Sequence, residues 1–438
     1  MKNVFSAFIL SIGVASASLS AVALAQETEW DMEEWGEEEK APKSFSGFVE
    51  LAAGARLSSD PIIDTDKTLA DLRAQLQWDK DFEASRVKFT ADLYYDGVLD
   101  QTKLQIRELA WQGSLSSIVD FGEWSKKFDI KVGQQVLTWG TGDYLFLNDL
   151  FPKDFQSFFA GRDDDYLKAP SLAAKVSGFF DWANVDAVIT PKFSPDNYIN
   201  GDYFSFFSPF AGANVAPGFE VSSPNKPSSP EYALRVYKTI GSTEYAIYAY
   251  KGFHKSPASF TEFGEPYFSG LRVYGASAIT PFASGLLNME MAYYDSKDDA
   301  QGRDPLVPNS QSRWLVGYEQ ELVKNLTGSA QLYVERMSNF DALKASSITP
   351  EFDPNKNRVL FTQRLMYRAL QQTLTLNAFN FYSTSDEDGY LKLSADYSPV
   401  DQWQLSGGFN VFYGKERFSF FNQFEDASNA FVRFKFYY

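Results

Sequence analysis

The side chains best suited to do chemistry in this sequence are arginines and lysines that alternate with apolar residues. Arg73 stands between Leu72 and Ala74, and Arg433 and Lys435 alternate with apolar residues near the end of the chain. A guanidinium group binds a carboxylate or phosphate through two parallel hydrogen bonds, and an ammonium group binds the same anions as a point charge. If these bases share one face, we expect that face to bind anions.

The alternation itself indicates β-strands, because successive side chains of a strand point to opposite faces. Eighteen segments of about 10 residues show it, which is the length of a tilted membrane strand. The predicted strands begin near Ser44, Lys67, Glu83, Gln101, Phe128, Pro170, Ala183, Glu231, Thr243, Ser269, Leu286, Ser312, Leu326, Arg358, Thr373, Tyr390, Trp403 and Asn429.

The links between these segments alternate in length. Links after even-numbered segments are usually tight, such as Gly241-Ser242, whereas most links after odd-numbered segments are longer, such as Trp139 to Ala169. Short periplasmic turns and long outer loops are typical of outer-membrane barrels. We therefore predict an all-β fold, a transmembrane antiparallel up-and-down β-barrel of eighteen strands, with sixteen as the alternative count. A soluble β-sandwich pair or β-helix is disfavoured, because one face of almost every strand is apolar.

The first residues have the features of a secretory signal. Lys2 supplies a positive charge, an apolar run extends from Val4 to Leu24, and Ala23-Leu24-Ala25 forms an A-x-A cleavage site. The alternative is a membrane-anchor helix. The chain contains no cysteine, so neither a lipoprotein N-terminus nor a disulfide framework is available. We predict a signal peptide over residues 1–25 and the barrel over residues 44–438.

Residues 26–43 are predicted to be an acidic, disordered tail. Eight carboxylates lie between Glu27 and Lys40, and charge of this density favours disorder. The tail has three candidate roles: it binds a periplasmic partner, it enters the barrel as a tethered plug, or it is a solubilising leader.

If the apolar positions face lipid, the alternate positions face the lumen. By this rule the inward bases outnumber the inward acids, which predicts a basic, anion-selective lumen. The alternative is that these bases pair with acids and hold the wall together. Glu108 and Arg336 fall on the lipid face by simple alternation, which predicts a bulge or a phase shift at each. The predicted inward bases are Arg73, Arg86, Lys88, Lys103, Arg107, Lys131, Arg235, Arg272, Arg313, Arg364, Arg368, Lys392, Arg433 and Lys435. The predicted inward acids are Glu50, Asp71, Asp92, Glu319, Glu335 and Asp396.

The long link after the fifth strand is predicted to constrict the barrel. It is rich in aromatic residues and glycine, which are unfavourable in water over such a length. Folding back into the barrel mouth would bury these residues and narrow the lumen. The alternatives are a cap over the outer rim and a dimer contact. The candidate constriction residues are Trp139, Asp143, Asp149, Asp154, Arg162, Asp163, Asp164 and Asp165.

The same stretch resembles a known family. Gly133-Gln134-Gln135, followed by Trp139-Gly140 and Asp143, is similar to the G-R-Q-x-x-x-x-[WY]-G-x-x-D signature of alginate-export-type outer-membrane proteins and their porin-like relatives, with three residues rather than four between Gln135 and Trp139. The resemblance implies an eighteen-stranded barrel with a basic conduit for an acidic polysaccharide. Gln134 stands where the signature has arginine, which weakens the implication of alginate itself. The match covers one strand and its loop closely, and the rest of the chain only as architecture.

Enzymatic chemistry has few candidates. The single histidine, His254, is predicted to be solvated in an outer loop rather than catalytic. The sequence shows no Cys/His metal cluster, no EF-hand spacing and no phosphate-binding or dinucleotide motif. We predict no catalytic residue, no cofactor and no nucleic-acid partner.

The sequence thus predicts a porin-like channel in the outer membrane of a Gram-negative bacterium, in contact with lipid and passing anionic or polar solutes or saccharides. Two alternatives remain at this stage. One is a partner-dependent export channel for an acidic polysaccharide, and the other is a structural or adhesive barrel with a filled lumen.

Overall fold

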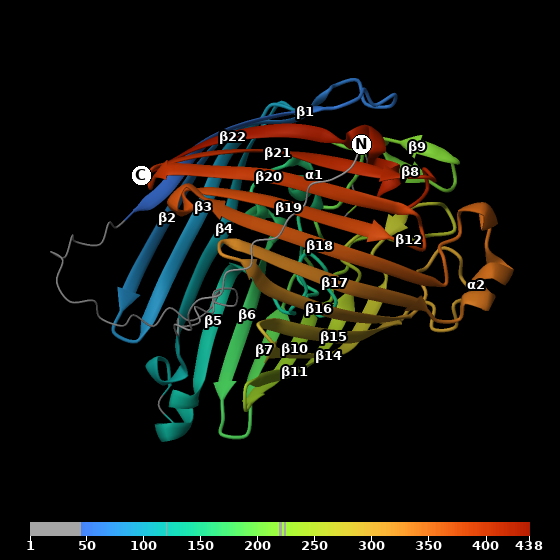
Figure 1. The fold of residues 1–438 in the computed structure, drawn as a ribbon. Coiled ribbons are helices and arrows are strands. Elements are labelled where there is room, and N and C mark those ends of the chain that lie inside the picture. The colour runs from blue at the N-terminus through green and yellow to red at the C-terminus, as the bar shows by residue number, and fades with distance from the viewer. Residues whose placement is uncertain (1–44, 120, 219–220, 223–224) are drawn as a thin grey trace, which may run out of the picture. The chain divides into compact units, whose positions relative to one another are not determined.

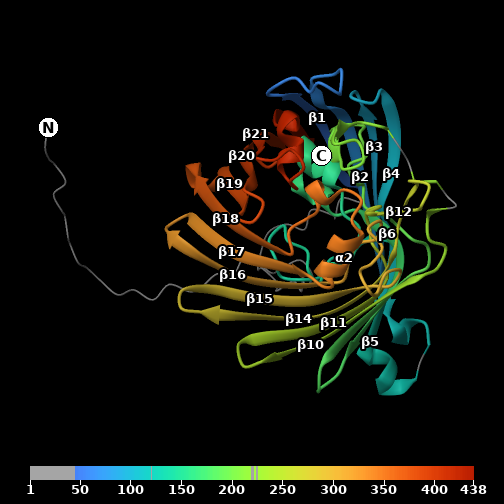
Figure 2. The same ribbon diagram turned by 90° about the vertical axis from the view of Figure 1, so that its right-hand side faces the viewer.

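The structure is a computed structural model that describes residues 45–119, 121–218, 221–222 and 225–438. The predicted signal peptide and acidic tail lie outside these residues. The described chain forms one eighteen-stranded antiparallel sheet, which closes where the first strand pairs with the last (Figures 1 and 2). Phe48 pairs with Tyr437 at one end of this seam and Arg56 pairs with Asn429 at the other. Closure satisfies the backbone of both strands, as a bilayer requires.

Each observed wall strand begins within two residues of its predicted start, so the predicted barrel is confirmed. The wall strands are β1 (Ser46–Arg56), β2 (Lys67–Phe82), β3 (Ser85–Asp96), β4 (Gln101–Ser114), β5 (Phe128–Val136), β6 (Pro170–Phe179), β7 (Asn184–Thr190), β10 (Glu231–Ile240), β11 (Thr243–Phe253), β14 (Gly270–Phe282), β15 (Gly285–Ser296), β16 (Gln311–Val323), β17 (Leu326–Met337), β18 (Asn357–Ala369), β19 (Leu374–Ser383), β20 (Asp388–Val400), β21 (Trp403–Gly414) and β22 (Asn429–Tyr437).

The remaining elements lie in the connections between wall strands. Two small hairpins pair β8 (Phe206–Ser208) with β9 (Ala213–Val215) and β12 (Ser259–Phe260) with β13 (Pro266–Tyr267). The helices are α1 (Phe155–Ala160), α2 (Phe340–Ser346), η1 (Leu115–Ser117), η2 (Gly122–Lys127), η3 (Asp164–Leu167), η5 (Pro350–Phe352), η6 (Leu370–Gln372) and η7 (Asn422–Ala427). Among the described residues, each helix is too short or too polar to cross a bilayer.

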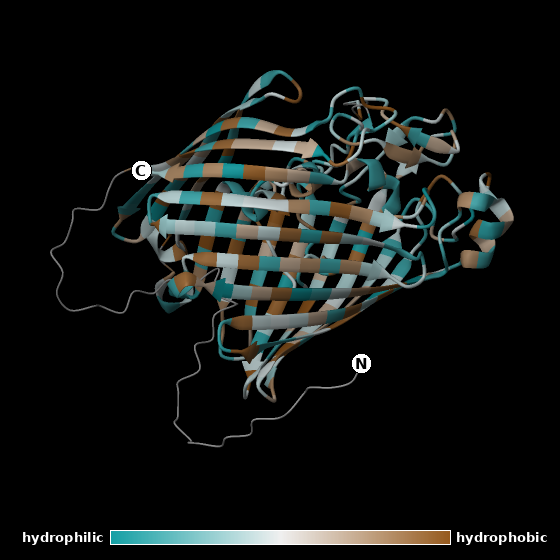
Figure 3. Ribbon diagram, turned by 45° about the horizontal axis from the view of Figure 1, so that its top comes forward, coloured by the Kyte–Doolittle hydropathy of each residue, from teal (hydrophilic) through white to brown (hydrophobic). Residues whose placement is uncertain are grey.

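The outer face of the wall is apolar, and Figure 3 shows hydrophobic and hydrophilic residues alternating along the strands. Leu93, Leu104 and Leu172 are examples of outward aliphatic residues that are solvent-accessible in the isolated chain. Exposed aromatic residues lie toward both ends of the outer face, as in the aromatic girdles of membrane barrels. One group comprises Tyr95, Tyr232, Tyr274, Tyr293, Trp314, Phe361 and Tyr382, and the other comprises Tyr245, Tyr367, Tyr397 and Trp403. This belt faces lipid.

The two ends of the barrel differ. Most links at one end are tight turns, such as residues 241–242 between β10 and β11. That end is periplasmic by the general rule for such barrels. The link between β4 and β5 is an exception, because residues 115–127 contain η1 and η2. The long loops gather at the opposite, extracellular end.

The extracellular half of the barrel has an apolar core. Phe158 and Phe159 of α1 pack against Tyr390 of β20, and Phe159 also packs against Phe412 of β21. All four side chains are buried. Apolar side chains therefore occupy both faces of the wall in this half, one facing lipid and the other facing α1.

Candidate functional site

The loop of residues 137–169 lies inside the barrel, where it contacts the wall on several sides. Its helix α1 begins at Asp154, whose carboxylate accepts a hydrogen bond from the Ser157 backbone N–H at 2.7 Å. The helix ends at Gly161, which has a left-handed backbone with φ 86°. A side chain at Gly161 would place its Cβ 2.3 Å from the ring of Phe431 in β22. The loop and the last strand are therefore in direct contact.

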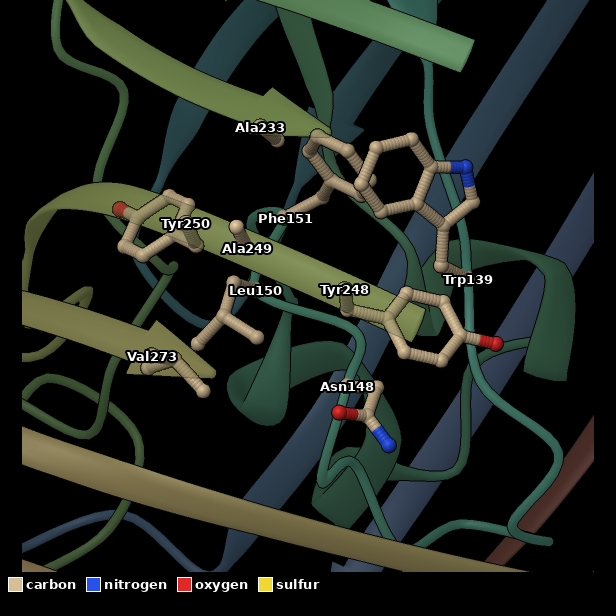
Figure 4. A pocket seen from close by; sticks show the side chains of 9 residues that line it. All are labelled: Trp139, Asn148, Leu150, Phe151, Ala233, Tyr248, Ala249, Tyr250 and Val273. Atoms are coloured by element: carbon tan, nitrogen blue, oxygen red, sulfur yellow. The ribbon is translucent and has the colours of Figure 1, made fainter. Parts of the chain in front are cut away.

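Trp139 anchors the start of the loop against β11. Its ring lies 5.0 Å from the Phe151 ring and 6.1 Å from the Tyr248 ring, measured between centroids. These side chains, with Asn148, line a small and mainly apolar pocket (Figure 4). The aromatic contacts fix where the loop leaves the wall.

Glu290 of β15 binds the next residues of the loop. Its Oε1 accepts hydrogen bonds from the Gly142 backbone N–H at 2.8 Å, the Thr141 hydroxyl at 2.9 Å and the Thr141 backbone N–H. Its Oε2 accepts from the Asn148 amide at 2.7 Å. Gly140 has φ 89°, and a Cβ there would lie 3.3 Å from the same carboxylate. The Trp-Gly pair of the sequence motif therefore brings the loop to the carboxylate of β15.

Asp143, the last residue of the motif, contacts β17 and β18, which follow β15 and β16 in the wall. Its carboxylate oxygen lies 3.0 Å from a guanidinium nitrogen of Arg364 in β18. Its backbone N–H and C=O are bound by the side-chain amide of Gln331 in β17, at 2.9 and 3.0 Å. Arg364 is 30 % exposed and Asp143 is 28 % exposed, so the pair is accessible from the lumen.

Arg162 joins the far end of the loop to β2 and β3. Its Nε and Nη2 donate to the two carboxylate oxygens of Asp71 at 2.6 and 3.2 Å, and Nη2 lies 3.4 Å from Asp96. Burial alone would lower the pKa of Arg162, but Asp71 and Tyr203 outweigh burial and raise it. Arg162 therefore stays charged and holds the loop.

The next two carboxylates bind the last strands of the wall. Asp163 accepts a hydrogen bond from Lys435 at 2.8 Å and lies 3.0 Å from Arg433, and Asp164 pairs with Lys392 of β20. Burial alone would raise the pKa of Asp163, but Lys435 and Arg433 outweigh burial and lower it. The loop carboxylates thus neutralise bases of the wall.

Two of the three remaining predicted carboxylates of the loop, Asp149 and Asp154, stabilise the fold of the loop itself. Asp149 lies 3.0 Å from Lys153 and accepts from the Thr138 hydroxyl at 2.9 Å, and Asp154 caps α1. Asp165 contributes its backbone carbonyl, which accepts from Arg107 at 2.8 Å.

Several of the predicted inward bases pair with acids of the wall. Arg73 lies 2.8 Å from Asp92, and its guanidinium carbon lies 4.1 Å from the Tyr94 ring centroid and 4.2 Å from the Tyr166 ring centroid. The structure also pairs Arg86 with Asp81, Lys103 with Asp96, Lys131 with Glu108, Arg235 with Glu244 and Arg313 with Glu335. Among the described residues, the side chains of Lys88 and Arg368 have no hydrogen bond or ion pair.

The bulge predicted at Glu108 is present. Pairing between β3 and β4 shifts between Thr90 and Ala91, so that Arg107 is the extra residue. The shift brings Glu108 to the inner face beside Lys131. No corresponding shift occurs at Arg336, which is exposed and pairs in register with Ser312. The prediction of a bulge there is wrong, and Arg336 lies on the outer face near the extracellular rim.

The inward orientation predicted for Arg272 is also wrong. Its neighbours Leu271 and Val273 belong to the buried core and are 3 % and 1 % exposed, so Arg272 points to the outer face. The alternation rule also left out several charged residues of the inner face, both acids and bases, among them the ion pair of Arg358 and Asp386. Further acids that contact inward groups are Asp81, Asp96, Glu108, Asp186, Glu231, Glu244, Glu290 and Asp388.

Sequence reasoning missed Glu290 and Gln331. A signal for Glu290 was present, because it stands between Met289 and Met291, which are both exposed on the outer face. Gln331 stands likewise between Ala330 and Leu332. Both would have been assigned to the lumen had the alternation rule been extended to every polar residue.

The described residues contain no cluster of three or more acidic or histidine side chains arranged to hold a metal ion.

His254 follows β11 and is only partly accessible, and its Nε2 is enclosed without a hydrogen-bond partner. Burial, and to a smaller extent the positive charge of Arg313, lower the pKa of His254 to about 4. The prediction of a solvated histidine is therefore wrong.

No protein-family model matches the sequence, and no curated protein matches it. Solved porin structures share its fold. Acinetobacter baumannii OccAB3 is 9 % identical with a TM-score of 0.53, over 90 % of this chain and 98 % of that chain. Pseudomonas aeruginosa OccK5 is 9 % identical with a TM-score of 0.52, over 90 % and 96 %. OccD3 of the same organism is 10 % identical with a TM-score of 0.50, over 90 % and 91 %.

Identities this low show a common fold alone. With the lipid-facing belt and the closed wall, they define the class of this chain: it is an outer-membrane β-barrel with the architecture of a porin. The narrower resemblance to alginate exporters is not shown by these comparisons.

Proposed function

We propose that the barrel is a porin-like channel that passes small anionic or polar solutes past the ion pair of Asp143 and Arg364. The observation that carries the proposal is the accessibility of this pair, which joins the inward loop to β18. A solute carboxylate has the same chemistry as Asp143 and can compete with it for the guanidinium of Arg364. Arg364 would then bind a passing anion transiently.

Two further bases support passage of anions. Lys88 and Arg368 alternate with the outward residues of β3 and β18, and the described residues offer neither side chain a hydrogen bond or an ion pair. Bases of this kind at the periplasmic side of the loop would attract anions within a Debye length of about 8 Å at physiological salt. Anion preference would therefore come from a few bases without a direct ion pair rather than from a generally positive wall.

Planar-bilayer recording tests the proposal. We expect the purified protein to give discrete current steps and, across a KCl gradient, a reversal potential that indicates anion preference. Arg364→Gln should shift that potential toward cation preference. Arg417→Gln is the matched control, because Arg417 pairs with Asp426 in an exposed loop, and it should leave the potential unchanged. A cation preference in the unmodified protein would contradict the anion assignment.

A barrel with a filled lumen is the second candidate, and the packing of α1 favours it. Phe158, Phe159 and their wall partners occupy the extracellular half, and ion pairs hold the loop to several strands. Absence of current steps from correctly folded protein would support this candidate and refute the channel. Swelling of protein-containing vesicles in glucose and in gluconate gives an independent measure, since a filled barrel admits neither.

The export channel suggested by the motif would require a partner, and the acidic tail is its candidate docking segment. Deletion of residues 27–40 separates the roles of the tail. An unchanged single-channel conductance would exclude the tethered plug. Loss of export in cells with conductance retained would favour a docking role.

A further inference from the structure

The connection between β4 and β5 differs from the tight turns at the same end of the barrel. Residues 241–242, 283–284 and 401–402 connect neighbouring pairs of wall strands at the same end. The β4–β5 connection instead forms η1 and η2, drawn in teal beside the start of β5 in Figures 1 and 2. A connection of this length is not needed to join two adjacent antiparallel strands, since two residues suffice.

The segment is held against the outer face of the wall. The Trp124 ring of η2 is stacked on Phe128 with 5.7 Å between centroids, and it meets Phe180 edge-on at 6.0 Å. Phe128 faces outward, in phase with Val132, which is exposed on the same strand. Phe128 pairs with Gly178, where a Cβ would lie 2.8 to 3.0 Å from the rings of Phe180 and Phe128. The absence of a side chain at Gly178 makes room for this aromatic cluster.

The backbone of η2 is also fixed locally. Ser125 is buried, and its hydroxyl donates to the Gly122 carbonyl at 2.7 Å. Lys126 lies 2.7 Å from Glu123. The position of the exposed side chains around this turn is therefore defined by the fold.

The exposed side chains of the segment are large and apolar. Phe121 is 70 % exposed, Trp124 is 63 % exposed and Ile118 is 56 % exposed. Trp182, stacked on Phe180 at 5.6 Å, is also exposed. Apolar residues clustered in this way mark an interaction surface.

We propose that residues 115–119 and 121–127, with Phe180 and Trp182, form an interfacial foot that binds the phospholipid headgroup region of the periplasmic leaflet. Two observations select lipid as the occupant. The aromatic cluster is continuous with the lipid-facing surface of β5 and β6, where Val132 and Leu172 are exposed. Tryptophan and phenylalanine beside lysines such as Lys127 also suit the boundary between acyl chains and headgroups.

The absence of cysteine allows single reporters to be introduced. Phe121→Cys and Ile118→Cys would carry a nitroxide spin label in the full chain, reconstituted into phosphatidylethanolamine and phosphatidylglycerol vesicles. Leu172→Cys provides the lipid-facing reference, and Ser242→Cys in the tight β10–β11 turn provides the aqueous reference. The heat-dependent shift in electrophoretic mobility verifies that each variant is folded.

We expect labels at 118 and 121 to collide with oxygen as the Leu172→Cys label does. Their accessibility to a water-soluble nickel chelate should be several-fold below that of the Ser242→Cys label. Chelate accessibility equal to that of Ser242→Cys would place the foot in water and overturn the proposal. Dipolar broadening that grows as the protein-to-lipid ratio rises would show that a second copy covers the foot, which also overturns it. A label at Val119→Cys repeats the measurement if either first variant fails to fold.

Discussion

Inside the barrel, Arg162 donates two hydrogen bonds to the carboxylate of Asp71, from Nε to Oδ2 at 2.6 Å and from Nη2 to Oδ1 at 3.2 Å. The two residues are separated by 91 positions in the chain. One belongs to the inward loop and the other to β2, so this pair determines where the loop crosses the lumen. It also explains why the loop cannot leave the barrel without exposing uncompensated charge.

Arg162→Ala should destabilise the protein strongly. Removing one partner of a buried ion pair leaves the other uncompensated, at a cost of about 3–5 kcal/mol. The measurement is the free energy of unfolding in urea, followed by tryptophan fluorescence in vesicles. Lys415→Ala is the control, because its pair with Glu387 is exposed, and it should have no measurable effect. Equal effects of the two substitutions would show that the Arg162 pair does not hold the loop.

Gly140→Ala should loosen the loop at Glu290. Alanine in the left-handed region costs about 1–2 kcal/mol, and disturbing the charge-assisted hydrogen bonds of Glu290 adds about 1.5–3 kcal/mol. Gly241→Ala is a matched control, because φ is 63° there and a Cβ would meet no atom within 4 Å. We expect the larger loss of unfolding free energy, and noisier channel currents, at Gly140. If both variants lose the same free energy, crowding against Glu290 is not responsible.

The contact of Asp163 with Lys435 should persist into acid. The folded-state pKa of Asp163 lies below its ordinary 3.8, so its stabilisation is fully present above about 3.8 and is lost as pH falls through the folded pKa. Asp163→Asn should cost about 3 kcal/mol at pH 7. The difference between the two proteins in unfolding free energy should be equal at pH 7 and pH 5, and smaller at pH 3. A difference already lost at pH 5 would contradict the lowered pKa.

His254 should remain neutral well below its ordinary pKa of 6.5. Its pKa of about 4 arises first from burial and then from Arg313. The folded state therefore resists a proton that the unfolded state accepts, and stability falls as pH drops from 6.5 toward 4. Because the chain has one histidine, NMR titration of labelled imidazole reports this group alone. A midpoint near 6.5 would show that the ring is solvated. His254→Gln should remove this part of the pH dependence.

Alternation along the sequence determined the wall of the barrel. A strand has two faces, and a membrane makes one of them apolar, so the period alone placed Leu72, Leu93 and Leu405 outward and located the strands. The cluster of aromatic residues and glycine after Trp139 indicated a buried loop, because such residues need burial, but left open whether the loop enters the barrel, caps its rim or contacts a second copy.

Tertiary structure decided the chemistry of the lumen. Alternation assigns apolar side chains to lipid, but α1 and its loop supply a second apolar surface inside the barrel. Leu271 and Val273 face that surface, which reverses the assignment of Arg272. Charge compensation also lay beyond the sequence, since Asp71, Asp163 and Glu290 meet partners far away in the chain. Only the folded loop shows that most bases of the wall are neutralised, and that Arg364 remains accessible beside Asp143.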